Sequence, residues 1–165
     1  MEYGCIGEKL SHSFSKIIHA RLADYNYELC EIPRGGLDGF MKKADFKAIN
    51  VTIPYKQAVI PYLYYISDTA KKIGAVNTVV NKNGKLYGYN TDFSGLHALL
   101  VRQRADLKGG KVLILGSGGT SKTAAAVAED LGAKEIYRVS RSGSDGAITY
   151  DEAYKKHGDA TAIIN

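Results

Sequence analysis

The sequence is short of several features that mark particular classes of protein. Its only cysteines, Cys5 and Cys30, cannot build the disulfide framework of a small secreted domain, which favours a reducing cytoplasm. The longest apolar runs reach about five residues, whereas a membrane-spanning helix needs ~20. Residues 1–20 lack the apolar core of a signal peptide. We therefore expect a soluble, cytoplasmic protein that does not act at a membrane.

The chain also lacks a large excess of positive or negative charge. Lysine and arginine number 22 against 17 aspartates and glutamates, and the basic residues are scattered as pairs such as Lys42 and Lys43. A nucleic-acid surface needs clustered positive charge, so we expect no nucleic-acid partner. With 45% hydrophobic residues, 24% charged residues and 3 prolines, the composition is that of a folded domain rather than a disordered region.

What the sequence does contain is an alternation of short β-rich runs with helical runs. Helices are predicted after Ser13, after Asp92 and around residues 124–131, where apolar residues recur at helical spacing. This alternation is typical of an α/β fold built from parallel βαβ units. The predicted strands are residues 3–6, 27–32, 48–52, 75–80, 86–89, 111–115, 135–139 and 161–164.

A polar, glycine-containing stretch near residues 102–110 indicates a domain boundary. We expect an N-terminal α/β substrate-binding domain over residues 1–101. Residues 102–165 are expected to form part of a Rossmann-type doubly wound parallel sheet. This second domain is incomplete, because a dinucleotide-binding fold is normally built from two mononucleotide-binding halves.

A glycine-rich turn follows the strand predicted at 111–115. Gly116, Gly118 and Gly119 allow a tight turn, so that amides at the start of the next helix can point at a pyrophosphate. The segment GSGGTSKT also nearly matches a P-loop, but Ser121 stands where that motif has a glycine before its lysine. We favour phosphate binding, while a purely structural turn stays an alternative.

The end of the following predicted strand carries Arg138, Ser140, Arg141 and Ser142, where NAD-preferring sites have an acidic residue for the ribose 2′-hydroxyl. An arginine beside hydroxyl groups instead suits a 2′-phosphate, which it can bind through two hydrogen bonds. We therefore expect NADP rather than NAD. The structural alternative is an exposed arginine at the end of a strand.

The N-terminal half holds further polar groups in SHSFS, NVTIPYK, AVNT and YNTD. Taken singly, each has a structural explanation: Ser13 and Asp92 could cap helices, and Lys56 could be a solvated lysine. Together they supply hydroxyls, amides, an ammonium and a carboxylate at strand ends and helix starts, where open α/β sheets bind ligands. That convergence indicates a site for a small polyhydroxylated acid.

These motifs, together with GSGGTSK and in this order, resemble those of the shikimate dehydrogenase family. The resemblance runs from the first strand to Asn165. It implies reversible oxidation of shikimate to 3-dehydroshikimate by hydride transfer to NADP, in aromatic amino-acid biosynthesis. It also implies that Ser13 and Ser15 hold the substrate carboxylate, that Thr52, Asn77 and Asp92 contact the ring hydroxyls, and that Lys56 and Asp92 form the catalytic pair.

The resemblance implies no metal ion and allows a homodimer. The Ser-Arg-Ser triplet at 140–142 departs from the Asn-Arg-Thr common in NADP-using members, so an NAD-using quinate/shikimate dehydrogenase stays an alternative. A non-catalytic ligand-binding relative is another alternative, although a pure binder would not need both Lys56 and Asp92. Which of these two takes the proton stays open. The cofactor-binding residues implied are Gly116, Ser117, Gly118, Gly119, Thr120, Ser140, Arg141 and Ser142.

Members of the family continue through a second half of the cofactor domain. We therefore expect this chain of 165 residues, taken alone, to bind shikimate weakly and to turn over slowly or not at all.

Overall fold

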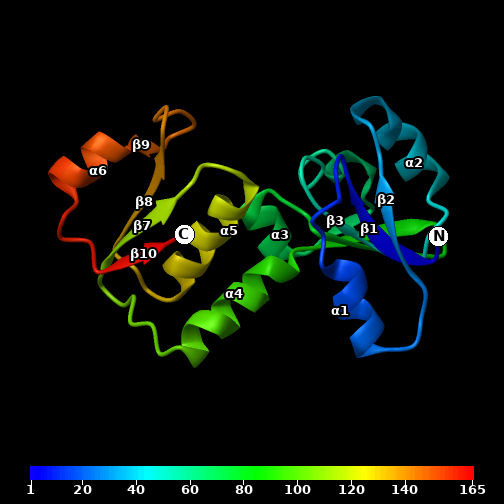
Figure 1. Ribbon diagram of the computed structural model, residues 1–165, viewed down its shortest axis with the longest axis horizontal. Coiled ribbons are helices and arrows are strands. Elements are labelled where there is room, and N and C mark those ends of the chain that lie inside the picture. The colour runs from blue at the N-terminus through cyan, green and yellow to red at the C-terminus, as the bar shows by residue number, and fades with distance from the viewer. The chain divides into compact units, whose positions relative to one another are not determined.

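The computed structural model describes residues 1–165 and divides into two compact units, a first unit of residues 1–91 and a second unit of residues 92–165. Each unit contains its own β-sheet flanked by helices (Figure 1). The mixed α/β fold predicted from the sequence is confirmed.

The first unit contains six strands, three α-helices and two short 3₁₀ turns, at Arg34–Gly36 and Ile60–Tyr62. In chain order the strands and helices are β1 (Tyr3–Gly7), α1 (Ser15–Leu22), β2 (Tyr27–Glu31), α2 (Leu37–Lys43), β3 (Ala48–Val51), β4 (Tyr65–Ile66), α3 (Asp68–Ile73), β5 (Thr78–Lys82) and β6 (Lys85–Tyr89).

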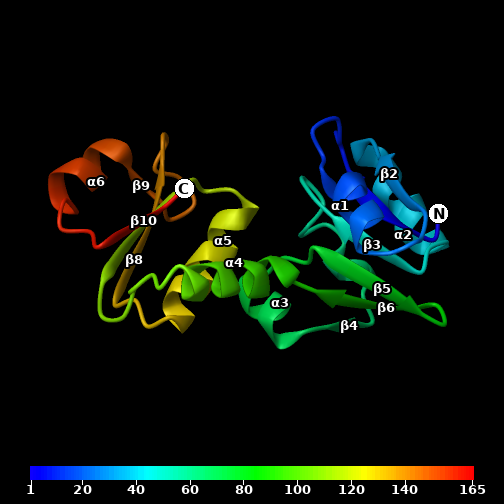
Figure 2. The ribbon, with the colours of Figure 1, turned by 60° about the horizontal axis from the view of Figure 1, so that its bottom comes forward.

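The sheet of the first unit is mixed rather than wholly parallel. Its strand order is β2-β1-β3-β5-β6-β4, and β1 pairs in parallel with both β2 and β3. The expectation of parallel units is wrong for β5, which runs antiparallel to β3 and to β6. The reason is a tight hairpin in which Asn83 and Gly84 have φ of 54° and 81°, a conformation that Asn-Gly adopts readily. Figure 2 shows β5 and β6 side by side, with β4 next to β6.

The two faces of this sheet bury different clusters. Successive residues of a strand point to opposite faces, so Ile6 joins the large core that also contains Leu37 and Met41 of α2. Cys5 points the other way and packs with Leu10 and Tyr27. Figure 1 shows α1 and α2 on opposite sides of β1 and β3.

Helix α1 forms where the sequence predicts a helix with one apolar stripe. None of its residues is buried, however, and Phe14, Ile17 and Leu22 are 73%, 58% and 70% exposed. The stripe is therefore present at helical spacing but does not contribute to the core of the first unit.

The second unit contains four parallel strands in the order β10-β7-β8-β9. Read from the opposite edge and numbered within the unit, this order is 3-2-1-4, which is the first part of the Rossmann order 3-2-1-4-5-6. The prediction of a partial Rossmann-type sheet is confirmed. Its elements are α4 (Thr91–Arg102), β7 (Lys111–Leu115), α5 (Gly119–Asp130), β8 (Glu135–Ser140), β9 (Ile148–Thr149), α6 (Tyr150–Lys156) and β10 (Ala162–Ile164).

The units divide at the start of α4, whereas the boundary expected between residues 101 and 102 falls at its end. Leu96 and Leu100 of α4 pack on the cluster that contains Val112 and Ile114 of β7, which explains why this helix belongs to the second unit. The functional division after residue 101 stays a prediction.

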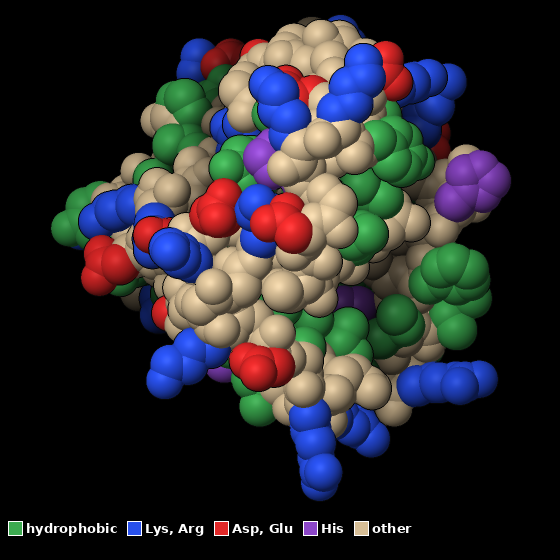
Figure 3. All heavy atoms as spheres, turned by 90° about the vertical axis from the view of Figure 1, so that its left-hand side faces the viewer, with side chains coloured by type: hydrophobic (Ala, Val, Ile, Leu, Met, Phe, Trp, Pro, Cys, Tyr) green, Lys and Arg blue, Asp and Glu red, His purple; other side chains and the backbone are tan.

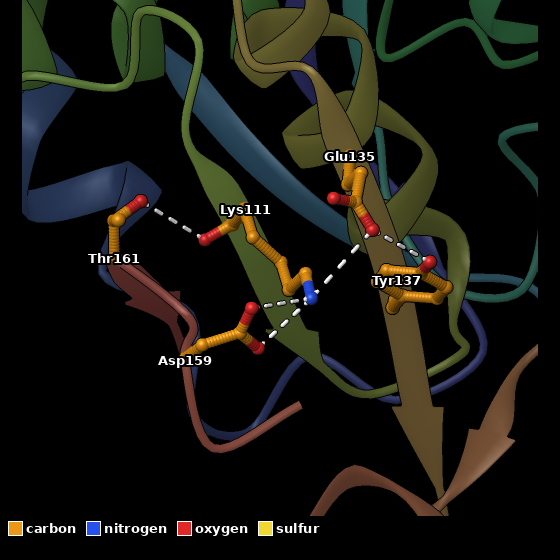
Figure 4. A network of polar contacts seen from close by, with 5 residues as sticks. All are labelled: Lys111, Glu135, Tyr137, Asp159 and Thr161. Carbon is orange, nitrogen blue, oxygen red and sulfur yellow. Dashed lines mark hydrogen bonds and ion pairs between the residues drawn. The ribbon is translucent and has the colours of Figure 1, made fainter. Parts of the chain in front are cut away.

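A polar network joins the start of β7 to the segment before β10 (Figure 4). Lys111 Nζ lies 2.8 Å from both carboxylate oxygens of Asp159 and 3.6 Å from a carboxylate oxygen of Glu135. The Tyr137 hydroxyl donates to Glu135 at 2.9 Å, and the Thr161 hydroxyl donates to the Lys111 carbonyl at 3.1 Å. Because Lys111 is the first residue of β7, this network lies at the opposite end of the strand from the glycine turn.

No helix in either unit combines the length and apolar character that a membrane crossing requires. On the face drawn in Figure 3, lysine and arginine side chains stand apart and among acidic side chains.

Candidate functional site

The topology of the first unit brings its polar motifs to one edge of the sheet. From β1 the chain passes through α1 to β2 on one side, and it returns through α2 to β3 on the other side of β1. The order of winding therefore reverses between β1 and β3, and open α/β sheets bind ligands beyond the carboxyl ends of the strands at such a point. The loop after β1 holds Ser13, and the loop after β3 holds Thr52 and Lys56.

A cleft of about 520 Å³ lies at this edge, a size that suits a small molecule. Three of the predicted substrate residues, Ser13, Ser15 and Thr52, line it together. The remaining lining residues are Cys5, Lys9, Leu10, Ser11 and His12. The structure thus brings together hydroxyl groups from the β1–α1 loop, the start of α1 and the end of β3.

Ser13 has a structural role as well as a place in the cleft. Its amide donates to the Leu10 carbonyl at 2.9 Å, and its Oγ accepts from the Ser15 amide at 3.3 Å. This contact closes a turn just before α1, whose N-cap is Phe14 and whose first residue is Ser15. Because Ser13 Oγ acts as an acceptor here, its own proton remains able to donate to a ligand.

Lys56 lies in the turn after β3 and is partly buried. Its carbonyl accepts from the Val76 amide at 2.8 Å, which anchors the turn to the segment before β5. Burial raises the pKa of the Cys5 thiol, and the positive charge of Lys56 acts in the opposite direction.

Asn77 is held at the same edge by the strand register. Thr78 pairs with Asn50 of β3 and with Tyr89 of β6, so the start of β5 adjoins the ends of both neighbouring strands. Asn77 is 7% exposed, and its Oδ1 accepts from the Thr91 amide at 2.8 Å and from the hydroxyls of Thr78 and Thr91 at 3.1 and 3.2 Å. These donors fix the orientation of the carboxamide.

Asn90 and Asp92 both belong to the YNTD motif but have different surroundings in the structure. Asn90 is buried, and its Nδ2 donates to the Ala75 carbonyl at 3.0 Å, which is a structural role. Asp92 follows Thr91 in the first turn of α4 and belongs to the second unit. Its pairing with Lys56 stays a prediction.

Three residues linked to Asn77 by hydrogen bonds are not predicted from the sequence, namely Tyr27, Asn50 and Thr78. The Tyr27 hydroxyl donates to Asn50 Oδ1 at 2.6 Å, and Asn50 Nδ2 donates to the Thr78 hydroxyl at 3.4 Å. Asn50 belongs to the NVTIPYK motif, so that motif could have indicated it. Tyr27 has no comparable signal, because an aromatic residue at the start of a strand is ordinary in a buried sheet.

In the second unit, the glycine turn connects β7 to α5. Gly116 has φ of 122°, and a Cβ added there would meet no atom within 4 Å. Helix α5 begins at Gly119, its N-cap Gly118 supplies no side-chain cap, and its first turn contains no acidic residue. The Ser121 amide donates to the Gly118 carbonyl at 3.0 Å, which leaves the earlier amides of α5 for an anion that the helix dipole also favours. Ser117 and Thr120 flank these glycines.

The residues at the P-loop positions of this turn make other contacts or are buried. The Ser121 hydroxyl donates to the Gly118 carbonyl at 2.6 Å. Thr123 is only 2% exposed, whereas the corresponding hydroxyl of a P-loop must reach a magnesium ion. The burial of Thr123 argues against the P-loop interpretation.

The loop after β8 is organised by its serines. Ser140 Oγ accepts from the Gly143 amide at 3.1 Å, and the hydroxyls of Ser142 and Ser144 lie 2.8 Å apart. Arg138 Nη2 donates to the Asp145 carbonyl within the same loop. Arg141 is exposed on this loop, so it is the arginine better placed to receive a phosphate.

No group of three or more His, Cys, Asp and Glu side chains is arranged to hold a metal ion.

Comparison with known proteins gives consistent results over both units. Residues 5–79 match the family described as the shikimate dehydrogenase substrate binding domain. A curated protein of Clostridium beijerinckii, named shikimate dehydrogenase (NADP(+)), is 44% identical over 158 residues, which cover 91% of this chain and 58% of that protein. The chain therefore spans a little over half the length of this relative.

Solved structures agree with this result. Shikimate dehydrogenase 1 of Peptoclostridium difficile superposes with a TM-score of 0.80 at 37% identity, covering 99% of this chain and 62% of that one. Shikimate 5-dehydrogenase of Thermus thermophilus, solved in complex with NADP(H) and shikimate, has a TM-score of 0.79 at 29% identity, covering 90% of this chain and 62% of that one.

Proposed function

We propose that the chain belongs to the shikimate dehydrogenase family over the part that it spans, and that it serves the interconversion of shikimate and 3-dehydroshikimate with NADP, in aromatic amino-acid biosynthesis. In the oxidative direction, one ring carbon would lose a hydride and its hydroxyl would lose a proton. Bound NADP⁺ would accept the hydride and become NADPH, while groups of the protein would pass the proton to water.

The observation that carries this proposal is the cleft of the first unit. Hydroxyls of Ser13, Ser15 and Thr52 line one cavity, and Lys9 lines it with them. Hydroxyl donors and a nearby cation suit a carboxylate, while further hydroxyl and amide groups suit ring hydroxyls. We propose that Ser13 and Ser15 hold the substrate carboxylate, and that Thr52, Asn77 and Asp92 contact the ring hydroxyls.

We propose Lys56 and Asp92 as the groups that handle the hydroxyl proton. A hydride leaves carbon readily only when this proton also leaves, and a positioned acid–base group typically contributes ~10²–10⁴-fold to such a step. The resemblance of NVTIPYK and YNTD to the family motifs supports both assignments.

The residues of the second unit fit NADP. The open backbone at Gly116 and the uncapped start of α5 at Gly118 and Gly119 suit the pyrophosphate, and Arg141 with its flanking serines suits the 2′-phosphate. When bound, NADP supplies the hydride acceptor. The full set proposed to bind it is Gly116, Ser117, Gly118, Gly119, Thr120, Ser140, Arg141 and Ser142.

In this proposal residues 1–101 form the substrate-binding and catalytic domain, and residues 102–165 form part of the NADP-binding domain. A cytoplasmic location is supported by the two free cysteines, which suit a reducing compartment. A homodimer stays a prediction that sedimentation equilibrium tests.

Binding of shikimate is the experiment that tests the substrate assignment. We expect shikimate to raise the unfolding temperature of the chain, because a ligand that binds only the folded state stabilises it. Ser13→Ala should weaken shikimate binding roughly 10- to 100-fold, the effect of losing a hydrogen bond to a charged group.

Ser67→Ala is the matched control for that variant. Ser67 Oγ accepts from the Ala70 amide at 3.3 Å at the start of α3, the same distance as the Ser13 contact, but Ser67 does not line the cleft. It should lose a similar amount of stability and keep its shikimate affinity. Equal affinities in the two variants would contradict the carboxylate site.

Absorbance at the reduced-nicotinamide band tests the reaction itself. Mixing the chain with shikimate and NADP⁺ should produce the band slowly, and Lys56→Ala should suppress it. Faster reduction of NAD than of NADP would favour the quinate/shikimate alternative. Shikimate binding without any reduction of either cofactor would support the substrate assignment and contradict turnover by this chain alone.

A further inference from the structure

Tyr27 occupies an unusual place in the first unit. It is the first residue of β2, it is 4% exposed, and its ring stacks on His19 of α1 with centroids 3.8 Å apart and planes 13° from parallel. The His19 ring in turn is hydrogen-bonded to the Tyr25 hydroxyl. The Tyr27 ring is therefore fixed between the sheet and α1, and its hydroxyl has a defined position.

From this hydroxyl, hydrogen bonds run in one direction across the sheet. The Tyr27 hydroxyl donates to Asn50 Oδ1 at 2.6 Å, Asn50 Nδ2 donates to the Thr78 hydroxyl at 3.4 Å, and that hydroxyl donates to Asn77 Oδ1 at 3.1 Å. Each donor fixes which way the next polar group faces. The phenol at the start of the series thereby determines that the Asn50 carboxamide presents its amino group to Thr78.

Burial raises the pKa of Tyr27, so the phenol keeps the proton that it donates to Asn50. The hydroxyl is thus a fixed donor at the start of the series.

We propose that the Tyr27 hydroxyl is a positioning group for the substrate site, acting through Asn50 and Thr78 on Asn77. This inference rests on the proposed function, which assigns a substrate contact to Asn77. Tyr27 does not line the cleft, so it acts through this residue. Loss of the Tyr27 hydroxyl should weaken substrate binding by releasing the orientation of the Asn77 carboxamide.

Tyr27→Phe removes the hydroxyl and keeps the ring on His19. We expect this variant to bind shikimate about 5- to 30-fold more weakly, the factor associated with losing one or two net hydrogen-bond contributions. The affinity for NADP, whose proposed site lies in the second unit, should not change.

Tyr55→Phe is the matched control. Tyr55 is 3% exposed, and its hydroxyl donates at 2.6 Å to the main-chain carbonyl of Ile32, in the core on the α2 side of the sheet. Both variants lose one short hydrogen bond from a buried tyrosine, so both should lose comparable stability. Only Tyr27→Phe should lose shikimate affinity. Equal shikimate affinity in the two variants would overturn the inference and reduce Tyr27 to a purely structural residue.

A second variant tests whether Tyr27 acts on Asn77 through Asn50 and Thr78. Thr78→Val keeps the shape of the side chain and interrupts the series between Asn50 and Asn77. If Tyr27 acts along this route, the double variant should bind shikimate more tightly than the product of the two single losses predicts. If the two losses of shikimate affinity multiply independently, Tyr27 does not act through Thr78.

These outcomes are distinguishable from a failure of the proposed function. If the unsubstituted chain does not bind shikimate, the substrate assignment fails and the positioning role fails with it. If the unsubstituted chain binds shikimate and Tyr27→Phe binds it equally well, the positioning role alone fails.

Discussion

Single residues in the proposed substrate site combine structural and ligand-binding duties. Ser13 accepts the Ser15 amide at the start of α1 and also lines the cleft. Of the two interpretations that the sequence allows for this serine, the helix cap is wrong, because the N-cap of α1 is Phe14 and Ser13 lies before it. A hydroxyl group can accept one hydrogen bond and donate another, whereas a carboxylate in the same place would only accept.

Gly116 is constrained by its backbone conformation and not by contacts with neighbouring atoms. Its φ of 122° is disfavoured for residues with a side chain, although an added Cβ would meet no atom within 4 Å. We expect Gly116→Ala to destabilise the second unit by roughly 1–2 kcal/mol and to weaken NADP binding by distorting the turn. Titration with NADP and chemical denaturation measure the two effects.

The control for this variant is Gly39→Ala. Gly39 lies inside α2 with no atom within 4 Å of an added Cβ and has ordinary helical geometry. Alanine should stabilise that helix by roughly 0.5–1 kcal/mol and leave NADP binding unchanged. If Gly116→Ala behaved like Gly39→Ala, the turn would not depend on its left-handed geometry.

At this scale the sequence indicates residues whose role follows from a local motif. Ser13, Ser15 and Thr52 belong to such motifs, and the structure places them in one cleft. Tyr27 could not be predicted, because its bond to Asn50 depends on how β2, β1 and β3 align across the sheet. That register is a property of the folded sheet and not of any local pattern.

Among the elements, the strands and the longer helices were predicted most reliably. The predicted ranges of β1, β7 and β8 agree with the structure to within one residue. The apolar run of β7 is typical of a parallel strand that is buried on both faces. Asn83-Gly84 is a local signal for a hairpin, whereas the general alternation of strands and helices predicts parallel units for β5 and β6. The local signal is the one that agrees with the structure. The two-residue strands β4 and β9 are too short to leave a periodic pattern.

The segment before β10 is attached to β7 by the Lys111–Asp159 pair, and this attachment should depend on pH. The hydrogen bonds from Lys111 lower the pKa of Asp159, and the same contact raises the pKa of Lys111. A lowered carboxyl pKa stabilises the fold above the ordinary aspartate value of about 4, and the contribution is lost as the pH falls through the lowered value. A raised lysine pKa stabilises the fold below about 10.4 and is lost as the pH rises through the raised value.

Asp159→Asn should therefore lower the denaturation midpoint by a constant amount between these limits. The difference from the unsubstituted chain should close in strong acid, where Asp159 is protonated in both states. Urea denaturation across the acid range measures it, with Glu152→Gln, at an exposed ion pair within α6, as the control. A difference of the same size in strong acid would show that the ion pair is not its cause.

For the molecule as a whole, strand order explains where the sites lie. In the first unit the winding reverses between β1 and β3, and the proposed substrate residues follow the ends of these strands. In the second unit the winding reverses between β7 and β10, and the glycine turn follows β7. The same topological rule therefore accounts for the position of the polar cleft in one unit and of the proposed anion site at a helix start in the other.

The most direct test of this account is a titration of the ¹⁵N-labelled chain with shikimate, followed by amide chemical shifts. The account predicts that the largest shifts occur at Ser13, Ser15, Thr52 and Asn77, at one edge of the first sheet, and that NADP instead shifts residues 116–120 and 140–142. Saturable shikimate-induced shifts confined to other parts of the chain, or no shifts at all, would contradict the proposed substrate site.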